Sequence, residues 1–139
     1  TGFSRISKVE GPDMPDVFLM LQKRWEDEKG NVYAKRVGTL VHRFTKNTPE
    51  WVNDAAFEIH YGNITKESFY RPYMGLVNGD DVKYTRNSKG KSVKIQEIGW
   101  ADADEKPTHL ILQFDSSYGG AYVGTIGTTF WLDNVRLRY

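Results

Sequence analysis

Short runs of alternating apolar and polar residues, separated by turn-forming residues, are the feature that most constrains the fold of this chain. Residues 55–61 alternate most cleanly, with Phe57, Ile59 and Tyr61 on one side of an extended chain. No window of the sequence repeats apolar residues at helical spacing over several turns. Many short strands joined by turns are typical of a sandwich or a barrel, so the sequence predicts an all-β fold.

Further strands are expected in the first half of the chain. Residues 16–23 are apolar at most positions, which predicts a central strand covered on both faces. Residues 25–31 read as a charged hairpin loop that contains a tryptophan, and residues 32–44 as a strand with a bulge or bend at Gly38. Residues 65–77 contain a proline and a glycine and predict an edge strand or an ordered loop.

The second half of the chain carries the most strongly indicated hairpin. It pairs residues 82–86 with residues 91–98 around a turn at 87–90, after an earlier turn at 78–81. A charged connection at 101–107 then leads to a strand expected to bury one alternating face: Leu110, Leu112 and Phe114.

The last strand is expected at residues 128–139. Phe130 and Leu132 share one face, whereas Val135 and Leu137 fall on the other. A one-residue change of parity predicts a bulge at 133–134, unless the strand is buried on both faces.

Composition limits the class of protein. The chain has 139 residues, a net charge of +1 and no cysteine. Such a balance gives no broad field of one sign, so nucleic acid is not an expected partner, and disulfides and thiolate chemistry are excluded. No apolar run approaches the roughly 20 residues of a membrane span. We expect a lead-in at 1–15 and a single β domain at 16–139, in a trimmed or processed chain that starts at Thr1.

Catalytic motifs are not evident, and we expect that the chain is not an enzyme. It lacks a Gly-x-Ser-x-Gly elbow, and its three histidines lie far apart in sequence. Two carboxylate pairs, Asp102 with Asp104 and Glu26 with Glu28, could each share one face of an extended segment. Both pairs lie in charged connections, where nothing would desolvate a carboxyl group for acid catalysis. We interpret them as solvated loop charges.

The C-terminal run SSYGGAYVGTIGTTFWLDNVRLRY resembles a known signature. Ser116-Ser117, Gly124, the Gly127 turn and the closing Trp131-to-Val135 strand are similar in order and spacing to the carbohydrate-metabolism domain of bacterial surface proteins. The closing pattern also resembles the last strand of jelly-roll carbohydrate-binding modules. The resemblance implies an antiparallel β-sandwich of jelly-roll type. It also implies a structural calcium ion, for which Asp133 would be a ligand; the alternative is that Asp133 binds backbone amides at the bulge.

Aromatic side chains are the remaining clue to function. Sugar rings stack their C–H faces on Trp or Tyr, while neighbouring polar groups bind the hydroxyls. We expect Trp100, Tyr118 and Tyr73 to be the exposed, sugar-binding aromatics, because each lies in or beside a loop. Five other aromatics are expected in the core: Trp51, Phe57, Phe114, Phe130 and Trp131. Trp25 and Tyr70 also lie in or beside loops.

These expectations combine into one functional hypothesis with two alternatives. The resemblance implies a non-catalytic carbohydrate-binding or accessory module of a secreted, periplasmic or outer-surface bacterial glycan-processing protein, with a polysaccharide or oligosaccharide as partner. The first alternative is a structural or adhesion module that binds a protein through a sheet edge or an aromatic patch. The second is a small glycoside hydrolase with an acid pair on a sheet face.

Overall fold

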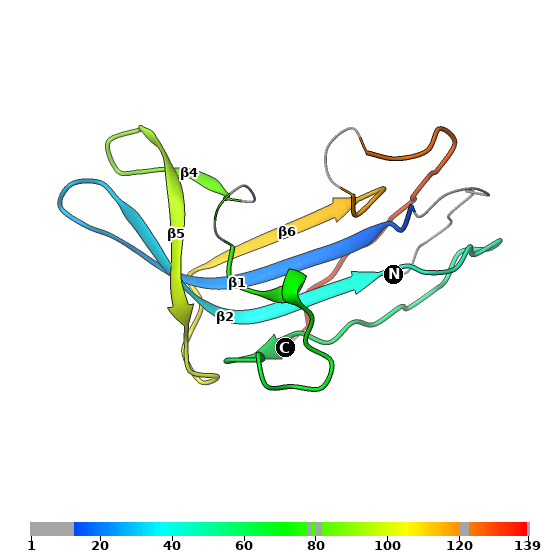
Figure 1. Ribbon diagram of the computed structural model, residues 1–139, viewed down its shortest axis with the longest axis horizontal. Helices are drawn as coiled ribbons and strands as arrows, with labels where there is room; N and C mark the ends of the chain where they lie inside the picture. The colour runs from blue at the N-terminus through cyan, green and yellow to red at the C-terminus, as the bar shows by residue number, and fades with distance from the viewer. Residues whose placement is uncertain (1–12, 78, 80–81, 120–122, 139) are drawn as a thin grey trace. The chain divides into compact units, whose positions relative to one another are not determined.

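A computed structural model describes residues 13–77, 79, 82–119 and 123–138 of the chain, and these residues form a β-rich fold (Figure 1). Its strands run in the order β4-β5-β2-β1-β6, and β3 pairs with β2 off this path. Their bounds are β1 (Asp16–Glu26), β2 (Val32–Arg43), β3 (His60–Tyr61), β4 (Tyr84–Arg86), β5 (Ser92–Trp100) and β6 (His109–Asp115), and the one described helix is a 3₁₀ turn, η1 (Pro72–Met74). None of the described helical residues makes a segment long and apolar enough to cross a bilayer.

The prediction of a β fold is confirmed, but the prediction of an antiparallel sheet is wrong. β2 and β5 run parallel, with Val32 opposite Ile95 and Arg36 opposite Trp100. Parallel neighbours need a crossover connection, and residues 44–91 provide it here by returning the chain to the end at which β2 began. The sheet is therefore mixed.

The chain divides into two compact units, each built from separate stretches of sequence. Unit 1 contains residues 13–18, Val41–Glu58 and 113–138, and unit 2 contains Leu19–Leu40 and Ile59–Leu112.

Unit 2 buries apolar side chains on both faces of β1 and β2. Leu19, Leu21, Val37 and Ala101 form one cluster, and Val32, Ala34 and Ile95 form another. The expectation that β1 is covered on both faces is confirmed, because its residues are buried at consecutive positions up to Gln22. Each fully buried aliphatic side chain contributes about 1.5–3 kcal/mol relative to an exposed one.

Two hairpin turns of unit 2 are joined by hydrogen bonds. Gly30 adopts a φ of 89° in the β1–β2 turn, and its carbonyl accepts a bond of 3.0 Å from Asn87 Nδ2 in the β4–β5 turn. Ser88 Oγ donates to Glu26 Oε1 at 2.6 Å. The predicted β4–β5 hairpin is confirmed, with Thr85 opposite Val93. The β1–β2 loop is shorter than predicted because β1 continues through Glu26.

Gly38 pairs in register with Tyr61 of β3, and the bulge or bend predicted at Gly38 stays a prediction. The register shift between β2 and β5 falls at Ala34 and Lys35, where Ile98 of β5 is the extra residue. A Cβ atom at Gly38 would lie 3.0 Å from Ile59 Cγ2 and 3.1 Å from Leu21 Cδ1. The glycine therefore lets these two side chains pack directly on the backbone of β2.

We expect Gly38→Ala to lower the free energy of unfolding by about 1–2 kcal/mol, because the added methyl group overpacks this cluster. Chemical denaturation of the purified variant measures the change. Gly99→Ala is the matched control, since a Cβ atom at Gly99 of β5 would meet no atom within 4 Å. A Gly38→Ala protein as stable as the control would contradict this packing.

Unit 1 contains a cluster of aromatic rings. The His42 ring lies 4.5 Å from the Phe57 ring, and the Phe44 ring lies 5.1 Å from the Phe130 ring, measured between centroids. Burial lowers the pKa of His42. Of the five aromatics expected in the core, Phe57, Phe114 and Phe130 are half-buried, whereas Trp51 and Trp131 are 53% and 39% exposed.

Two strand predictions need correction. Of residues 55–61, only His60 and Tyr61 form a strand, because pairing with β2 covers just two positions. In β6 the predicted face is inverted at its start: Leu110 and Leu112 are exposed, while Ile111 packs against the Val32 cluster. Alternation fixes which residues share a face of a strand but not which face meets the core.

The predicted strand at 128–139 is absent from its described part, residues 128–138, so the bulge at 133–134 is absent too. Asn134 adopts a left-handed φ of 53°, and its backbone N–H donates to Asp133 Oδ1 at 2.8 Å. Such local bonds compete with strand pairing. Most of the predicted lead-in, residues 1–12, and most of the turn at 78–81 lie outside the described residues. Within the remainder, the Met14 and Pro15 carbonyls accept bonds from Tyr118 and Phe44.

Candidate functional site

The three aromatics predicted from the sequence have different surroundings. Trp100 ends β5 and is half-buried, with the Arg36 guanidinium carbon 5.6 Å from its ring centroid. Tyr73 lies in η1 of the same unit and is 43% exposed. Tyr118 belongs to unit 1, is 39% exposed, and has the Arg43 guanidinium carbon 4.2 Å from its ring centroid. Trp100 therefore contributes packing to Arg36, whereas the two tyrosines present accessible surface.

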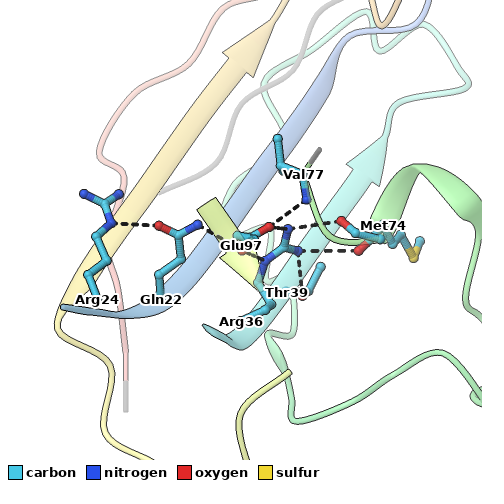
Figure 2. A network of polar contacts seen from close by, with 8 residues as sticks. Gln22, Arg24, Arg36, Thr39, Met74, Val77 and Glu97 are labelled. Carbon is cyan, nitrogen blue, oxygen red and sulfur yellow. Dashed lines mark hydrogen bonds and ion pairs between the residues drawn. The ribbon is translucent and has the colours of Figure 1, made fainter. Parts of the chain in front are cut away.

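A buried ion pair lies at the centre of unit 2 (Figure 2). Arg36 of β2 and Glu97 of β5 form two parallel bonds, Nη2 to Oε1 at 2.6 Å and Nε to Oε2 at 2.7 Å. Both side chains are excluded from solvent, with exposures of 0% and 1%. This forked geometry is the one that Arg and carboxylate groups form most favourably.

The four acceptor positions of the Glu97 carboxylate are all occupied. Besides the two bonds from Arg36, Oε1 accepts the backbone N–H of Val77 at 2.7 Å and Oε2 accepts Gln22 Nε2 at 2.9 Å. The Gln22 Oε1 atom accepts Arg24 Nε at 2.8 Å, which extends the network toward the surface. A carboxylate held in this way has no acceptor position left for a ligand, so we assign the network a structural role.

The network fixes the segment that follows η1. Arg36 donates to the Met74 and Gly75 carbonyls at 3.4 and 3.1 Å, and to Thr39 Oγ1 at 3.1 Å. Residues 74–77 lack strand or helix partners beyond η1, so these bonds satisfy backbone groups that would otherwise be buried unpaired. The position of Tyr73 depends on this anchoring.

An exposed aromatic pair lies on the neighbouring surface of the β1–β2 hairpin. Trp25 of β1 and Tyr33 of β2 stack with ring centroids 5.9 Å apart and an interplanar angle of 26°. Trp25 is 41% exposed, and Tyr33 is half-buried. The hydrogen bond from Asp27 N to Asn31 O fixes the hairpin register, which places the two rings directly opposite each other. The pair forms a pre-positioned apolar platform.

Charged residues surround this platform. Lys23 and Lys35 lie two positions from Trp25 and Tyr33 along their strands, and therefore on the same face. Lys23 Nζ forms an ion pair of 2.7 Å with Glu105 Oε2. This hydrogen bond is the main reason that the pKa of Glu105 is lowered, with smaller contributions from the Asp102 backbone and the Lys35 charge.

We call this surface the Trp25 face and define it by five residues: Lys23, Trp25, Tyr33, Lys35 and Glu105. This face was not predicted from the sequence, because the first strand was expected to end before Trp25. A usable signal was present, since Trp25 and Tyr33 lie equally far from the centre of the turn that contains Gly30. Equal spacing from a hairpin turn predicts a cross-strand pair.

The four carboxylates expected to be solvated are all exposed, and that of Glu26 also accepts the Ser88 N–H and hydroxyl groups. A different carboxylate pair in unit 1, Asp16 and Asp115, was not predicted from the sequence. Burial and the Asp115 charge raise the pKa of Asp16 to about 6, while Arg43, 3.9 Å away, lowers it.

The Asp133 side chain accepts the backbone N–H of the next residue, Asn134. The alternative interpretation placed such a bond at a bulge, which the described residues 128–138 do not form. Calcium requires six to eight oxygen ligands. No three His, Asp or Glu side chains gather as metal ligands among the described residues. A calcium role for Asp133 stays a prediction that this geometry does not support.

Comparison of the chain with family models, curated proteins and solved structures gives no match, so the resemblance of its C-terminal run to a carbohydrate-metabolism domain stays a prediction.

Proposed function

We propose that this chain is a non-catalytic carbohydrate-binding or accessory module of a secreted or surface-exposed bacterial glycan-processing protein. A jelly-roll β-sandwich is the architecture that the sequence resemblance implies for such a module. The proposal rests on the resemblance of residues 116–135 and on the geometry of the Trp25 face.

The observation that carries the proposal is the stacked pair of Trp25 and Tyr33. An indole that is 41% exposed and held by a neighbouring ring loses little conformational entropy when a flat ligand stacks on it. A polar group beside it, the Lys23 ammonium, is held in place by Glu105 and can donate to a ligand oxygen. An apolar wall with a few placed polar groups is typical of a sugar site.

The same face favours binding over hydrolysis. Glycosidases need two carboxyl groups that flank the scissile bond, one of them protonated as the general acid. Of the two carboxylates beside the aromatic pair, Glu105 has its pKa lowered by its bond to Lys23, and Asp27, which accepts the Tyr33 hydroxyl, has its pKa lowered by its bonds to Asn31. A carboxylate stabilised in its charged form is a poor proton donor.

We expect Trp25→Ala to abolish glycan retention on an array, or to weaken it by at least about tenfold, because an aromatic contact contributes about 1–3 kcal/mol. The Tyr73→Ala and Tyr118→Ala variants are the matched controls, since each removes an exposed tyrosine from another part of the chain. If only these controls lost binding, the sugar would lie at the aromatics predicted from the sequence. If the wild type retained no glycan at millimolar concentration, the proposed function would be wrong.

One observation favours an adhesion module as the second candidate. β6 ends the strand order of the sheet, and its Leu110 and Leu112 side chains are 46% and 38% exposed. Exposed leucines on a terminal strand are suited to pairing with a strand of a protein partner. The array separates the two candidates, because an adhesion module would retain no glycan.

A further inference from the structure

We propose that the Trp25 face selects acidic saccharides, in which a carboxylate or sulfate group lies next to the ring that stacks on Trp25. This inference rests on the proposed function and names its ligand class. It is argued from the charges that border the aromatic pair.

The Trp25 face carries two ammonium groups and one carboxylate, and a second carboxylate, that of Asp27, borders it at the Tyr33 hydroxyl. Counting back from the turn places Lys23 opposite Lys35 on the antiparallel strands, where like charges repel each other. Glu105 neutralises one of them through its 2.7 Å bond to Lys23. Within the described part of the chain, Lys35 Nζ forms neither a hydrogen bond nor an ion pair, although its charge acts on Glu105, so its ammonium group can meet an anionic ligand.

The spacing suits a single ligand that uses both parts of the face. Residues two apart on a strand lie about 6.5–7 Å from each other, so both lysines lie one such step from the aromatic pair. A sugar ring stacked on Trp25 could direct an exocyclic anionic group between Lys23 and Lys35. There the anion would lie beside Lys23, which Glu105 bonds, and beside Lys35, whose charge acts on Glu105 without a bond.

The test is an array of matched acidic and neutral glycans, followed by titration of the wild type and three variants. We expect the retained glycans to be acidic, and we expect their affinity to fall as salt concentration rises. Arms that carry carboxylate and arms that carry sulfate on the same backbone identify which anion is preferred. Retention of neutral glycans alone would overturn this inference and leave the proposed function intact, and retention of none would overturn both.

Two variants of the Trp25 face are expected to change the affinity for an acidic glycan in opposite directions. Lys35→Gln should weaken binding of the acidic glycan about two- to fivefold, as expected for a partly exposed charge pair. Glu105→Gln should tighten it by a similar factor, because Lys23 is released. Lys94→Gln, which removes an exposed lysine of β5, is the control for net charge. Weaker binding by the Glu105→Gln protein would show that Glu105 bonds sugar hydroxyls and would contradict the selection of anions.

Discussion

The Glu97→Gln protein is expected to unfold with a free energy about 3–5 kcal/mol lower than that of the wild type, although the two side chains have the same shape. In the wild type, four donors surround the Glu97 carboxylate. An amide offers one oxygen, so its NH₂ group would face two donors whichever way it turned. Arg36 would also keep its charge in the buried site without a counter-ion. Equilibrium denaturation with urea measures the change.

Glu28→Gln is the matched control, because Glu28 is exposed at the tip of the β1–β2 hairpin. It removes the same charge from the same unit, and we expect its unfolding midpoint to equal that of the wild type. An unfolding midpoint of Glu97→Gln that also matched the wild type would mean that the network does not hold the Met74-to-Val77 segment against the sheet. A shift comparable to the prediction would also explain why a charged pair is kept inside a small β fold.

Acidification from pH 7 to pH 4.5 is expected to stabilise unit 1 through Asp16. The folded state raises the pKa of this carboxyl from 3.8 to about 6, so it binds a proton more tightly than the unfolded chain does. The resulting stabilisation is fully present below pH 4 and is lost as the pH rises through 6. It amounts to as much as about 3 kcal/mol, since one pKa unit corresponds to 1.36 kcal/mol. Arg43 opposes the effect by favouring the charged form.

The Asp16→Asn variant isolates this contribution. Asparagine can donate a hydrogen bond to Asp115 at any pH, so the variant should be more stable than the wild type at pH 7 and about equal to it at pH 4.5. Thermal unfolding of both proteins at the two pH values measures the difference in their stabilities. The contributions of the other titrating groups are the same in both proteins and cancel in this difference. Asp104→Asn changes an exposed loop position, and its stability should differ from that of the wild type by the same amount at both pH values. A stability difference between Asp16→Asn and the wild type that did not change with pH would show that folding does not raise the pKa of Asp16.

Local signals in the sequence predicted the elements whose partners are close in the chain. The β4–β5 hairpin follows from its turn at 87–90, and the burial of β1 follows from an apolar run that leaves no polar face. The parallel pairing of β2 with β5 could not be predicted in this way. It depends on where residues 44–91 lead the chain, and no periodicity records that path.

The predictions that failed depended on which face of a strand was assigned to the core, or on the resemblance of the closing segment to a strand of a known family. The alternation at Leu110 and Leu112 predicted a strand correctly but assigned its faces wrongly. The closing segment at 128–138 has strand-like composition, yet Asn134 in a left-handed conformation interrupts it. For the site, composition identified aromatics as the relevant residue type. Recognising Trp25 required the hairpin register, which one hydrogen bond in the turn defines.

The pairing of β2 with β5 has a consequence for how the chain is made. Arg36 and Glu97 are 61 positions apart in the sequence. At a synthesis rate of about 5–20 residues per second, β5 is therefore made roughly 3–12 s after β2. Throughout that interval one edge of β2 exposes unsatisfied backbone groups, and Arg36 lacks its counter-ion. Nascent chains should therefore be captured by chaperones, or aggregate, until the ribosome has passed residue 100. Refolding in vitro should likewise take milliseconds to seconds.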